Sequence, residues 1–149
     1  MISFDFVPLH KVGHEIAPNI ARHYAEMSDG DEYGVPEIDW DTYLALSHAG
    51  HCLVLTVRDG EKLVGYSVYT IGRNPRYKQI IEASSAGIFL EKEYRGKLSE
   101  QFIKKADEYL KKIGVQETIY VLSDDRVGRL LGRGGYESKY KVWSIKYGQ

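Results

Sequence analysis

The length, charge and cysteine content of the chain exclude several classes of protein. Its 149 residues include 20 lysines and arginines against 21 aspartates and glutamates, so the net charge is −1. A chain of this size supports one hydrophobic core, and we expect a single domain over residues 1–149. The charge lacks the cation surplus of a dedicated nucleic-acid binder. The single cysteine, Cys52, excludes an internal disulfide.

Two further features concern the compartment. No run of about 18 apolar residues could span a bilayer. The first twelve residues alternate apolar and polar side chains instead of forming a signal peptide. We therefore expect a cytoplasmic protein without a membrane partner.

The N-terminal third predicts one strand and two helices. Alternating apolar residues over 2–6 indicate a strand. Apolar residues at helical spacing over 16–27 predict a helix that begins near Ala17, since Pro18 is tolerated only in a first turn. Breaking residues predict a loop over 28–36. Asp39 or Asp41 then caps a short helix that ends at Gly50.

The middle of the chain predicts a hairpin. Residues 51–57 and 62–71 are strand-like, and the Asp-Gly pair within 58–61 favours a two-residue turn in which both central residues have positive φ. Residues 72–76 indicate a loop, and residues 79–90 a further long strand.

The last third alternates helix and strand. An apolar stripe over 98–113 predicts a long helix that Gly114 terminates. Residues 118–122 form a short strand, parallel to its predecessor if the crossover is right-handed. Asp124 or Asp125 caps a helix through Leu131, and residues 136–147 form a terminal strand or tight hairpin. This order indicates an α/β or α+β fold.

The most informative segment runs from residue 88 to residue 99 as strand, short basic loop and helix. Unpaired N–H groups at the helix start and the helix dipole favour an anion there. Arg95 and Lys97 add positive charge, and Gly96 lets the backbone approach closely. The segment therefore predicts an anion-binding turn.

The same segment resembles the acetyl-CoA-binding motif of the GNAT N-acetyltransferase superfamily, whose loop has the sequence Tyr-Arg-Gly-x-Gly-x-Gly. Residues 63–66 are similar to the family's central strand, and residues 130–136 to its late helix. Residues 23–26 and 77–78 are similar to a small bacterial and phage branch. The resemblance implies a central, mixed, twisted sheet flanked by helices. It also implies direct acetyl transfer from acetyl-CoA to an amine of a small molecule or protein.

The chain departs from the family pattern at three positions. Leu98 and Glu100 replace two loop glycines, and Leu131 stands where many relatives have a tyrosine. A Glu100 side chain facing the loop would compete with a pyrophosphate for the positive helix end. These departures motivate an alternative, a catalytically degenerate GNAT-fold protein that binds a partner or senses acyl-CoA.

The resemblance also implies site residues. The backbone of Ile88 and Leu90 is expected to pair with the pantetheine arm, and Arg126 or Arg129 to pair with the adenosine phosphate. The expected general acid is Tyr120, Tyr136 or a water molecule. The candidate general bases are Glu82, Glu26 and His23, in that order. The complete cofactor set is Ile88, Phe89, Leu90, Arg95, Gly96, Lys97, Leu98, Ser99, Glu100 and Arg129.

The acceptor is open at this point. Acidic residues in and after the 28–36 loop would favour a cationic amine, and simple solvation explains them equally well; they are Asp29, Asp31, Glu32 and Glu37. The histidines lack the third ligand of a metal site, so no metal is expected. Exposed sheet edges and a short last strand allow a homodimer.

Overall fold

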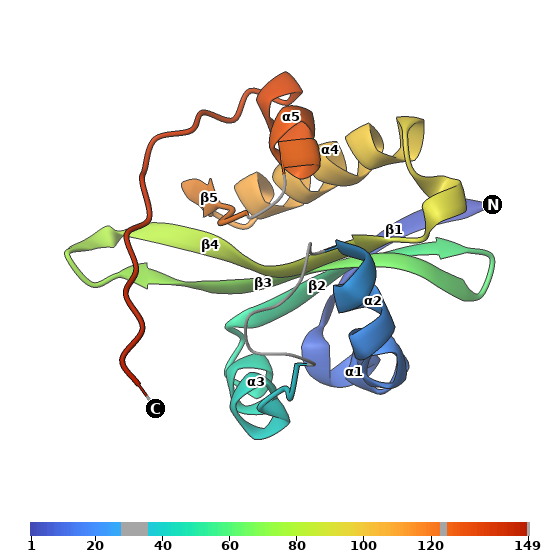
Figure 1. Cartoon of the computed structure of the whole chain (residues 1–149), viewed down its shortest axis with the longest axis horizontal. Helices are drawn as coiled ribbons and strands as arrows, with labels where there is room; N and C mark the ends of the chain where they lie inside the picture. Colours follow the sequence, from blue (N-terminus) through green and yellow to red (C-terminus); the bar gives the residue numbers. More distant parts are fainter. Residues whose placement is uncertain (28–35, 123–124, 149) are drawn as a thin grey trace.

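A five-stranded sheet forms the centre of the molecule in the computed structural model, which describes residues 1–27, 36–122 and 125–148 (Figure 1). The strands lie in the order β1-β2-β3-β4-β5, with β1 to β4 antiparallel and β5 parallel to β4. Their bounds are β1 Ile2–Pro8, β2 Cys52–Asp59, β3 Lys62–Asn74, β4 Tyr77–Leu90 and β5 Glu117–Ile119. The predicted mixed sheet, including its parallel last pair, is confirmed.

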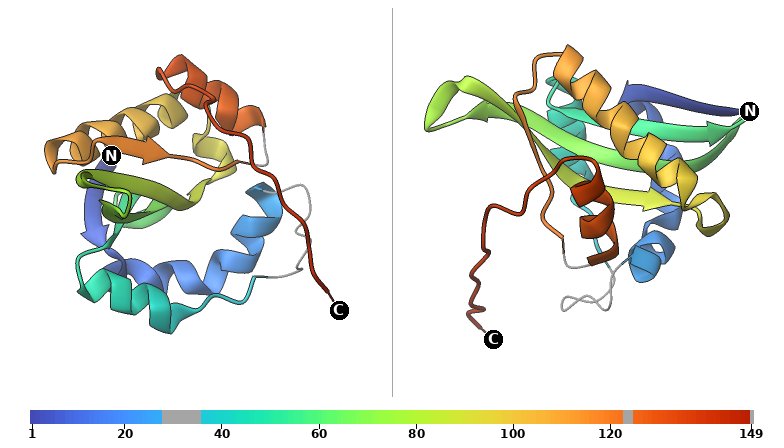
Figure 2. Two further views of the ribbon diagram at one scale, coloured as in Figure 1. Left: turned by 90° about the vertical axis from the view of Figure 1, so that its left-hand side faces the viewer. Right: turned by 90° about the horizontal axis from the view of Figure 1, so that it is seen from above.

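Helices cover both faces of this sheet. The two views of Figure 2 show the sheet between a layer of α1, α2 and α3 and a layer of α4 and α5. We call these sides the α1–α3 face and the α4–α5 face. The helix bounds are α1 Leu9–Ile16, α2 Ile20–Met27, α3 Trp40–His48, α4 Lys97–Lys112 and α5 Asp125–Arg133. None of the helices formed by the described residues is long and apolar enough to cross a lipid bilayer.

Each face has its own hydrophobic core. On the α4–α5 face, Phe102 and Leu110 of α4 pack against Leu55, Val57 and Tyr69 of the sheet. The core of the α1–α3 face contains Leu9, Val12, Ile16, Cys52, Val54, Tyr66 and Phe89. Because strand side chains point to both faces, β2, β3 and β4 contribute residues to both cores.

The N-terminal helical region differs from the prediction. The sequence indicates one helix beginning near Ala17, whereas the structure has α1 directly after β1, a 3-10 turn over Ala17–Asn19, and then α2. Pro18 lies in that turn because it has no N–H to donate to a continuing α-helix. Further along, the predicted cap of α3 is confirmed: Thr42 N donates to Asp39 Oδ1 at 3.1 Å.

Two turns of the sheet also differ. Asp59 pairs with Lys62, so Gly60 and Glu61 are the central residues of the first hairpin, and only Gly60 (φ 63°) has positive φ. The expected Asp-Gly turn with two positive φ values is therefore wrong, and the turn starts with glycine. In the second hairpin, β3 and β4 continue through most of the expected 72–76 loop and turn only at residues 75–76.

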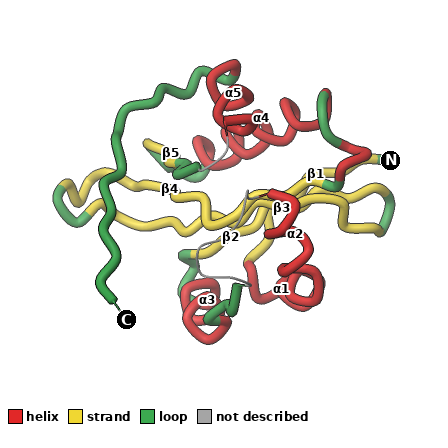
Figure 3. Tube along the Cα trace, in the orientation of Figure 1, coloured by secondary structure: helices red, strands yellow, loops and turns green. Residues whose placement is uncertain are grey.

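The C-terminal prediction is wrong in its pairing. Residues 136–148 are all described, and they form an extended chain outside the sheet (Figure 3). They pair with no strand of the described chain, and the three-residue strand β5 presents too short an edge to hold a long neighbour in register. The expected loop residues 28–35, including Asp29, Asp31 and Glu32, and the candidate cap Asp124 lie outside the described residues.

Candidate functional site

The sheet opens between β4 and β5. The two strands pair at only three positions, from Glu82↔Glu117 to Ser84↔Ile119, and β4 then continues alone to Leu90. The opening begins beside a bulge in β4, because the register with β3 passes from Tyr69↔Ser85 to Val68↔Gly87 and leaves Ala86 without a partner. We call the opening beside residues 85–90 the notch.

Backbone polar groups of β4 face the notch. Glu91 N donates to Val64 O at 2.8 Å, which makes this a hydrogen-bonded pair of the antiparallel ladder. Such pairs alternate, so the next residue of β4, Leu90, and then Ile88 direct their N–H and C=O groups away from β3. These are the two residues from which the sequence predicts backbone contacts. The ladder turns Phe89 N–H and C=O toward β3, and the Phe89 ring is buried in the α1–α3 core.

A tight turn joins the end of the notch to α4. Gly96 precedes the helix with φ 97°, a conformation that favours glycine. Its N–H donates to Ser99 Oγ at 3.2 Å, and Ser99 N donates back to Gly96 O at 3.0 Å. Apart from Ser99 N, the amides of the first helical turn have no partners within the helix, so the positive end of α4 is directed at this turn.

Leu98 and Glu100, the two departures from the family motif, leave the turn clear. The Leu98 side chain packs against the core of the α4–α5 face. Glu100 Oε1 lies 3.2 Å from Arg133 Nε at the end of α5, so its carboxylate is paired away from the turn. Of Lys97 the structure describes the backbone alone, and Arg129 is exposed on α5.

Arg95 does not point into the turn. Its Nε donates to Leu90 O at 2.8 Å, and its Nη2 lies 3.2 Å from Glu26 Oε2 on α2. The guanidinium carbon lies 5.8 Å from the centre of the Phe89 ring. The side chain thus connects the end of β4 to α2, which sequence reasoning did not anticipate.

His23 belongs to the same connection. It is 8% exposed, its ring stacks on Phe89 at 3.8 Å, and its Nδ1 lies 2.8 Å from the Tyr66 hydroxyl. Burial lowers the pKa of the His23 imidazole, and the Arg22 charge lowers it further. Next to it, Arg22 contacts Glu91 at 2.8 Å and Glu26 at 3.2 Å. We call these alternating charges, Arg22, Glu26, Glu91 and Arg95, the charge clamp.

Glu82 lies elsewhere. It pairs with Glu117 at the end of the three-pair β4–β5 ladder that is farther from the notch, and its neighbour Ala83 is in the α4–α5 core. The half-buried Glu82 side chain therefore faces the α1–α3 side, three residues before the notch begins. It is about 23 Å along β4 from Phe89 at about 3.3 Å per residue. The three candidate bases therefore do not converge.

Tyr120 follows β5 immediately, on the other side of the notch. Its hydroxyl is 2.6 Å from that of Tyr69 on β3, and its ring meets Tyr136 edge-on at 5.4 Å. The Tyr136 hydroxyl donates to Asp107 of α4. Burial raises the pKa of the Tyr120 hydroxyl. Sequence reasoning missed Tyr69 and Asp107, although a tyrosine within an apolar strand does indicate a buried hydroxyl that needs a partner.

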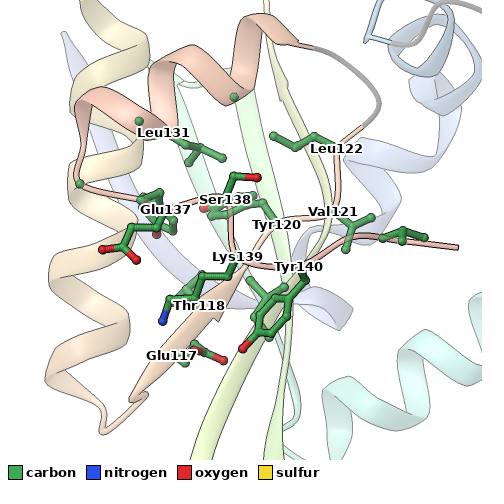
Figure 4. A pocket seen from close by; sticks show the side chains of 16 residues that line it. Glu117, Thr118, Tyr120, Val121, Leu122, Leu131, Glu137, Ser138, Lys139 and Tyr140 are labelled. Carbon is green, nitrogen blue, oxygen red and sulfur yellow. The ribbon is translucent and has the colours of Figure 1, made fainter.

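A groove of about 670 Å³ lies on the outer side of β5 (Figure 4). One wall is residues 117–122, and the others are α5 and residues 135–142. The groove adjoins the notch through Tyr120 and is mixed in character, with Glu117, Glu137 and Lys139 beside apolar side chains.

No protein-family model and no curated protein matches the chain. Solved structures match it over its whole length. A ribosomal-protein-alanine N-acetyltransferase from Brucella melitensis biovar Abortus 2308 is 15% identical with a TM-score of 0.70, covering 99% of this chain and 100% of its own. An aminoglycoside acetyltransferase from an uncultured soil metagenomic sample is 12% identical with a TM-score of 0.73, covering 99% of both chains.

A third similar structure is a transcriptional regulator from Bacillus halodurans C-125, 14% identical with a TM-score of 0.73, covering 99% of this chain and 100% of its own. At these identities the likeness concerns the architecture, and a fold does not determine an activity. The chain has the GNAT acetyltransferase fold.

Proposed function

We propose that this protein is an acetyl-CoA-dependent N-acetyltransferase that moves an acetyl group directly to an amine. The observation that carries the proposal is the notch, where β4 continues past its last pair with β5 and directs the backbone of Ile88 and the N–H of Leu90 away from β3, while Leu90 O accepts from Arg95. Unpaired strand backbone inside a sheet requires a partner. The peptide-like amides of a pantetheine arm are a suitable one.

The residues present also fit the other end of acetyl-CoA. The first turn of α4 offers backbone N–H groups and the positive end of a 16-residue helix to a diphosphate. The side chains of Leu98 and Glu100 point away from the turn, so the two residues that stand in place of glycines do not block this site. Arg95 supports the site indirectly by holding Leu90 O, while the backbone binds the phosphates.

The chemistry needs a proton acceptor and a proton donor. Glu82, on the α1–α3 side of β4 three residues before the notch, takes a proton from the ammonium form of the acceptor, directly or through a water. The amine nitrogen then attacks the thioester carbon, the C–N bond forms, and the C–S bond breaks. The strand N–H groups stabilise the developing oxyanion. Tyr120 donates a hydrogen bond to the departing thiolate, and the thiolate takes up the second proton, which the nitrogen loses as the amide forms.

The binding step is tested at Ser99. In Ser99→Asp, a carboxylate can still accept the Gly96 N–H, and an acid suits the first helical turn, so the fold should persist. The added charge should weaken acetyl-CoA binding at least about tenfold by repulsion of the diphosphate. Ser99→Asn is the neutral control and should bind like the wild type. Equal dissociation constants for all three proteins in calorimetric titration would exclude the turn as the phosphate site.

The transfer step is tested with a panel of polyamines, aminoglycosides and peptides and with radiolabelled acetyl-CoA. Glu82→Gln should lower kcat about 100-fold or more while leaving the dissociation constant for acetyl-CoA unchanged. A matched change, Glu117→Gln, alters the neighbouring carboxylate without removing the proposed base. Cofactor binding without transfer to any amine would instead favour a sensor of acyl-CoA.

A further inference from the structure

The hairpin of β3 and β4 projects from one end of the molecule. Its strands have 13 and 14 residues, and Figures 1 and 2 show that it extends beyond the helices of both faces. The residues from Arg73 to Gln79 are exposed, except for the half-buried Asn74. We call residues 70–81 the hairpin arm. It lies outside the notch and the turn before α4.

The charges of the hairpin arm are all positive. Arg73, Arg76 and Lys78 lie within six residues of each other, and the arm contains no aspartate or glutamate. Among the described residues, no carboxylate forms an ion pair with any of these three cations. Because the whole chain has a net charge of −1, the residues outside the arm are acidic in sum. This separation of charge turns the arm toward a negatively charged partner.

Backbone groups of the arm also lack strand partners. The register shift beside Arg73 leaves residues 78–80 without partners on β3, and the pairs between β4 and β5 begin only at Glu82. Arg73 Nη1 donates to Lys78 O at 3.0 Å, which fixes this bulge and leaves the other N–H groups of the guanidinium available. Main-chain N–H groups beside fixed cations form a site for anions such as phosphate.

We propose that the hairpin arm binds double-stranded DNA, as a second function of this protein. The three cations and the free amides of the bulge contact backbone phosphates on the two sides of a groove. Tyr77 and the turn residue Pro75 contact the sugars between them. The major groove of B-form DNA is about 12 Å wide and admits a two-stranded ribbon, whereas the major groove of duplex RNA is too narrow.

The surface of the arm suits a nucleic acid better than an acidic protein. A stable protein interface buries about 800 Å² on each partner, around side chains anchored in a pocket. The arm exposes one large apolar side chain, Tyr77 (55%), and the cavities beside β5 and β1 include none of its residues. Binding to a phosphate backbone depends on cations instead of on buried apolar area.

The overall charge limits the affinity without preventing this binding. On the two strands of the arm, the nearest acidic residue is Glu82, about 13 Å from Lys78 at about 3.3 Å per residue. At 0.1 M ionic strength, exposed charges more than about 10 Å apart are largely screened from each other. A phosphate at the arm therefore interacts mainly with the three cations. We expect the affinity of a non-specific complex, with a Kd of about 10⁻⁴–10⁻⁶ M at physiological salt.

The first test measures affinity against salt concentration. Fluorescence anisotropy of a labelled DNA duplex of about 20 base pairs should show binding, with log K falling against log salt at a slope of about −2.7 for three phosphate contacts. Arg76→Gln and Lys78→Gln should each reduce the slope to about −1.8. Lys11→Gln removes an exposed cation from α1 and should match the wild type. No binding at about 25 mM salt, or the same slope in all four proteins, overturns the proposal.

The second test identifies the ligand by competition. Unlabelled duplex DNA should displace the labelled duplex at least about tenfold more effectively than duplex RNA or polyglutamate at the same concentration of charge. Equal displacement by polyglutamate would mean that the arm attracts any polyanion, and equal displacement by duplex RNA would mean that it does not enter the major groove; either result overturns the proposal. Arg76→Gln should bind acetyl-CoA like the wild type, so this proposal and the proposed acetyl transfer can fail separately.

Discussion

Strand β4 has two edges, and the sequence around each is organised differently. Toward β3 it is paired from Asn74↔Tyr77 to Gly65↔Leu90, with two register shifts that leave residues 78–80 and Ala86 without partners on β3. Toward β5 it is paired at three positions and then open. The paired edge arises from a hairpin, whose strands are neighbours in sequence, whereas the open edge depends on a crossover through α4.

This difference separates stability from binding within one strand. The residues along the edge that pairs with β3 belong to both hydrophobic cores, so we expect substitutions there to lower the free energy of unfolding. The β5 edge leaves polar backbone and space that a ligand can use. Substitutions that are chemically alike should therefore have unlike effects on the two sides, and the following predictions measure that contrast.

The largest contrast concerns two leucines. Leu55 on β2 is 1% exposed in the α4–α5 core, whereas Leu122, just beyond β5, is 39% exposed. Leu55→Ala should lower the free energy of unfolding by about 2–5 kcal/mol through lost burial and a cavity. Leu122→Ala should cost less than about 1 kcal/mol. Urea denaturation followed by circular dichroism measures both, and similar losses would mean that the β5 side is as tightly packed as the core.

A second contrast concerns two glycines, Gly65 of β3, which pairs with Leu90, and Gly87 within β4 itself. A Cβ on Gly65 would lie 2.7 Å from Leu90 Cδ1 and 2.9 Å from Phe89 O, whereas a Cβ on Gly87 would meet nothing within 4 Å. Gly65→Ala should destabilise the protein by about 1–3 kcal/mol. Gly87→Ala should change stability by less than about 0.5 kcal/mol.

Thermal unfolding of the two alanine variants gives the comparison directly. Gly87 is on the α1–α3 side of the notch, two residues before Phe89, so its alanine fills space near the proposed acceptor. A loss of stability in Gly87→Ala as large as that in Gly65→Ala would show that the notch is closed in solution.

The same distinction explains how far sequence reasoning reached. Elements with local signals were predicted well: Asp39 caps α3, Gly114 (φ 99°) ends α4, and β2 and β3 form the expected hairpin. The turn before α4 was found because its glycine and basic residues are consecutive. The helix start predicted from Pro18 was wrong, because proline is tolerated in the first turn of a helix and also in a 3-10 turn that joins two helices.

Features that depend on distant partners could not be predicted. Arg95 is next to the turn in sequence, but its direction is set by Glu26, which is 69 residues earlier on α2. The Tyr69–Tyr120 contact joins residues from two elements that only the sheet order brings together. The terminal segment has a strand pattern and no strand partner in the described chain, and such a pattern cannot specify where its partner lies.

A smaller predicted effect concerns the charge clamp, which connects the end of β4 to α2. Glu91 (side chain 18% exposed) pairs with Arg22, and Glu15 (33% exposed) pairs with Arg58 far from the turn. Glu91→Gln and Glu15→Gln should each cost about 0.5–1 kcal/mol, since both pairs are partly exposed. Only Glu91→Gln should also weaken acetyl-CoA binding severalfold, because Glu91 begins the turn. Equal affinities in the two variants would show that the clamp does not order the turn.

The smallest predicted effect is a pH dependence at His23. Burial lowers its pKa in the folded protein and Arg22 lowers it further, while Glu91 and Glu26 act in the opposite direction. Since the unfolded chain binds a proton at higher pH than the folded one, His23 contributes stability above its unfolded pKa of about 6.5. That contribution is lost as pH falls through 6.5 toward the folded value.

The melting temperature of the wild type should therefore decline more steeply between pH 7.5 and 5 than that of His23→Gln, which keeps a polar partner for the Tyr66 hydroxyl. His14→Gln is the matched control, since His14 is exposed on α1, and it should follow the wild type. Parallel curves for the wild type and His23→Gln would mean that the pKa of His23 is the same in the folded and the unfolded chain, because the charges of Glu91 and Glu26 offset burial and the Arg22 charge.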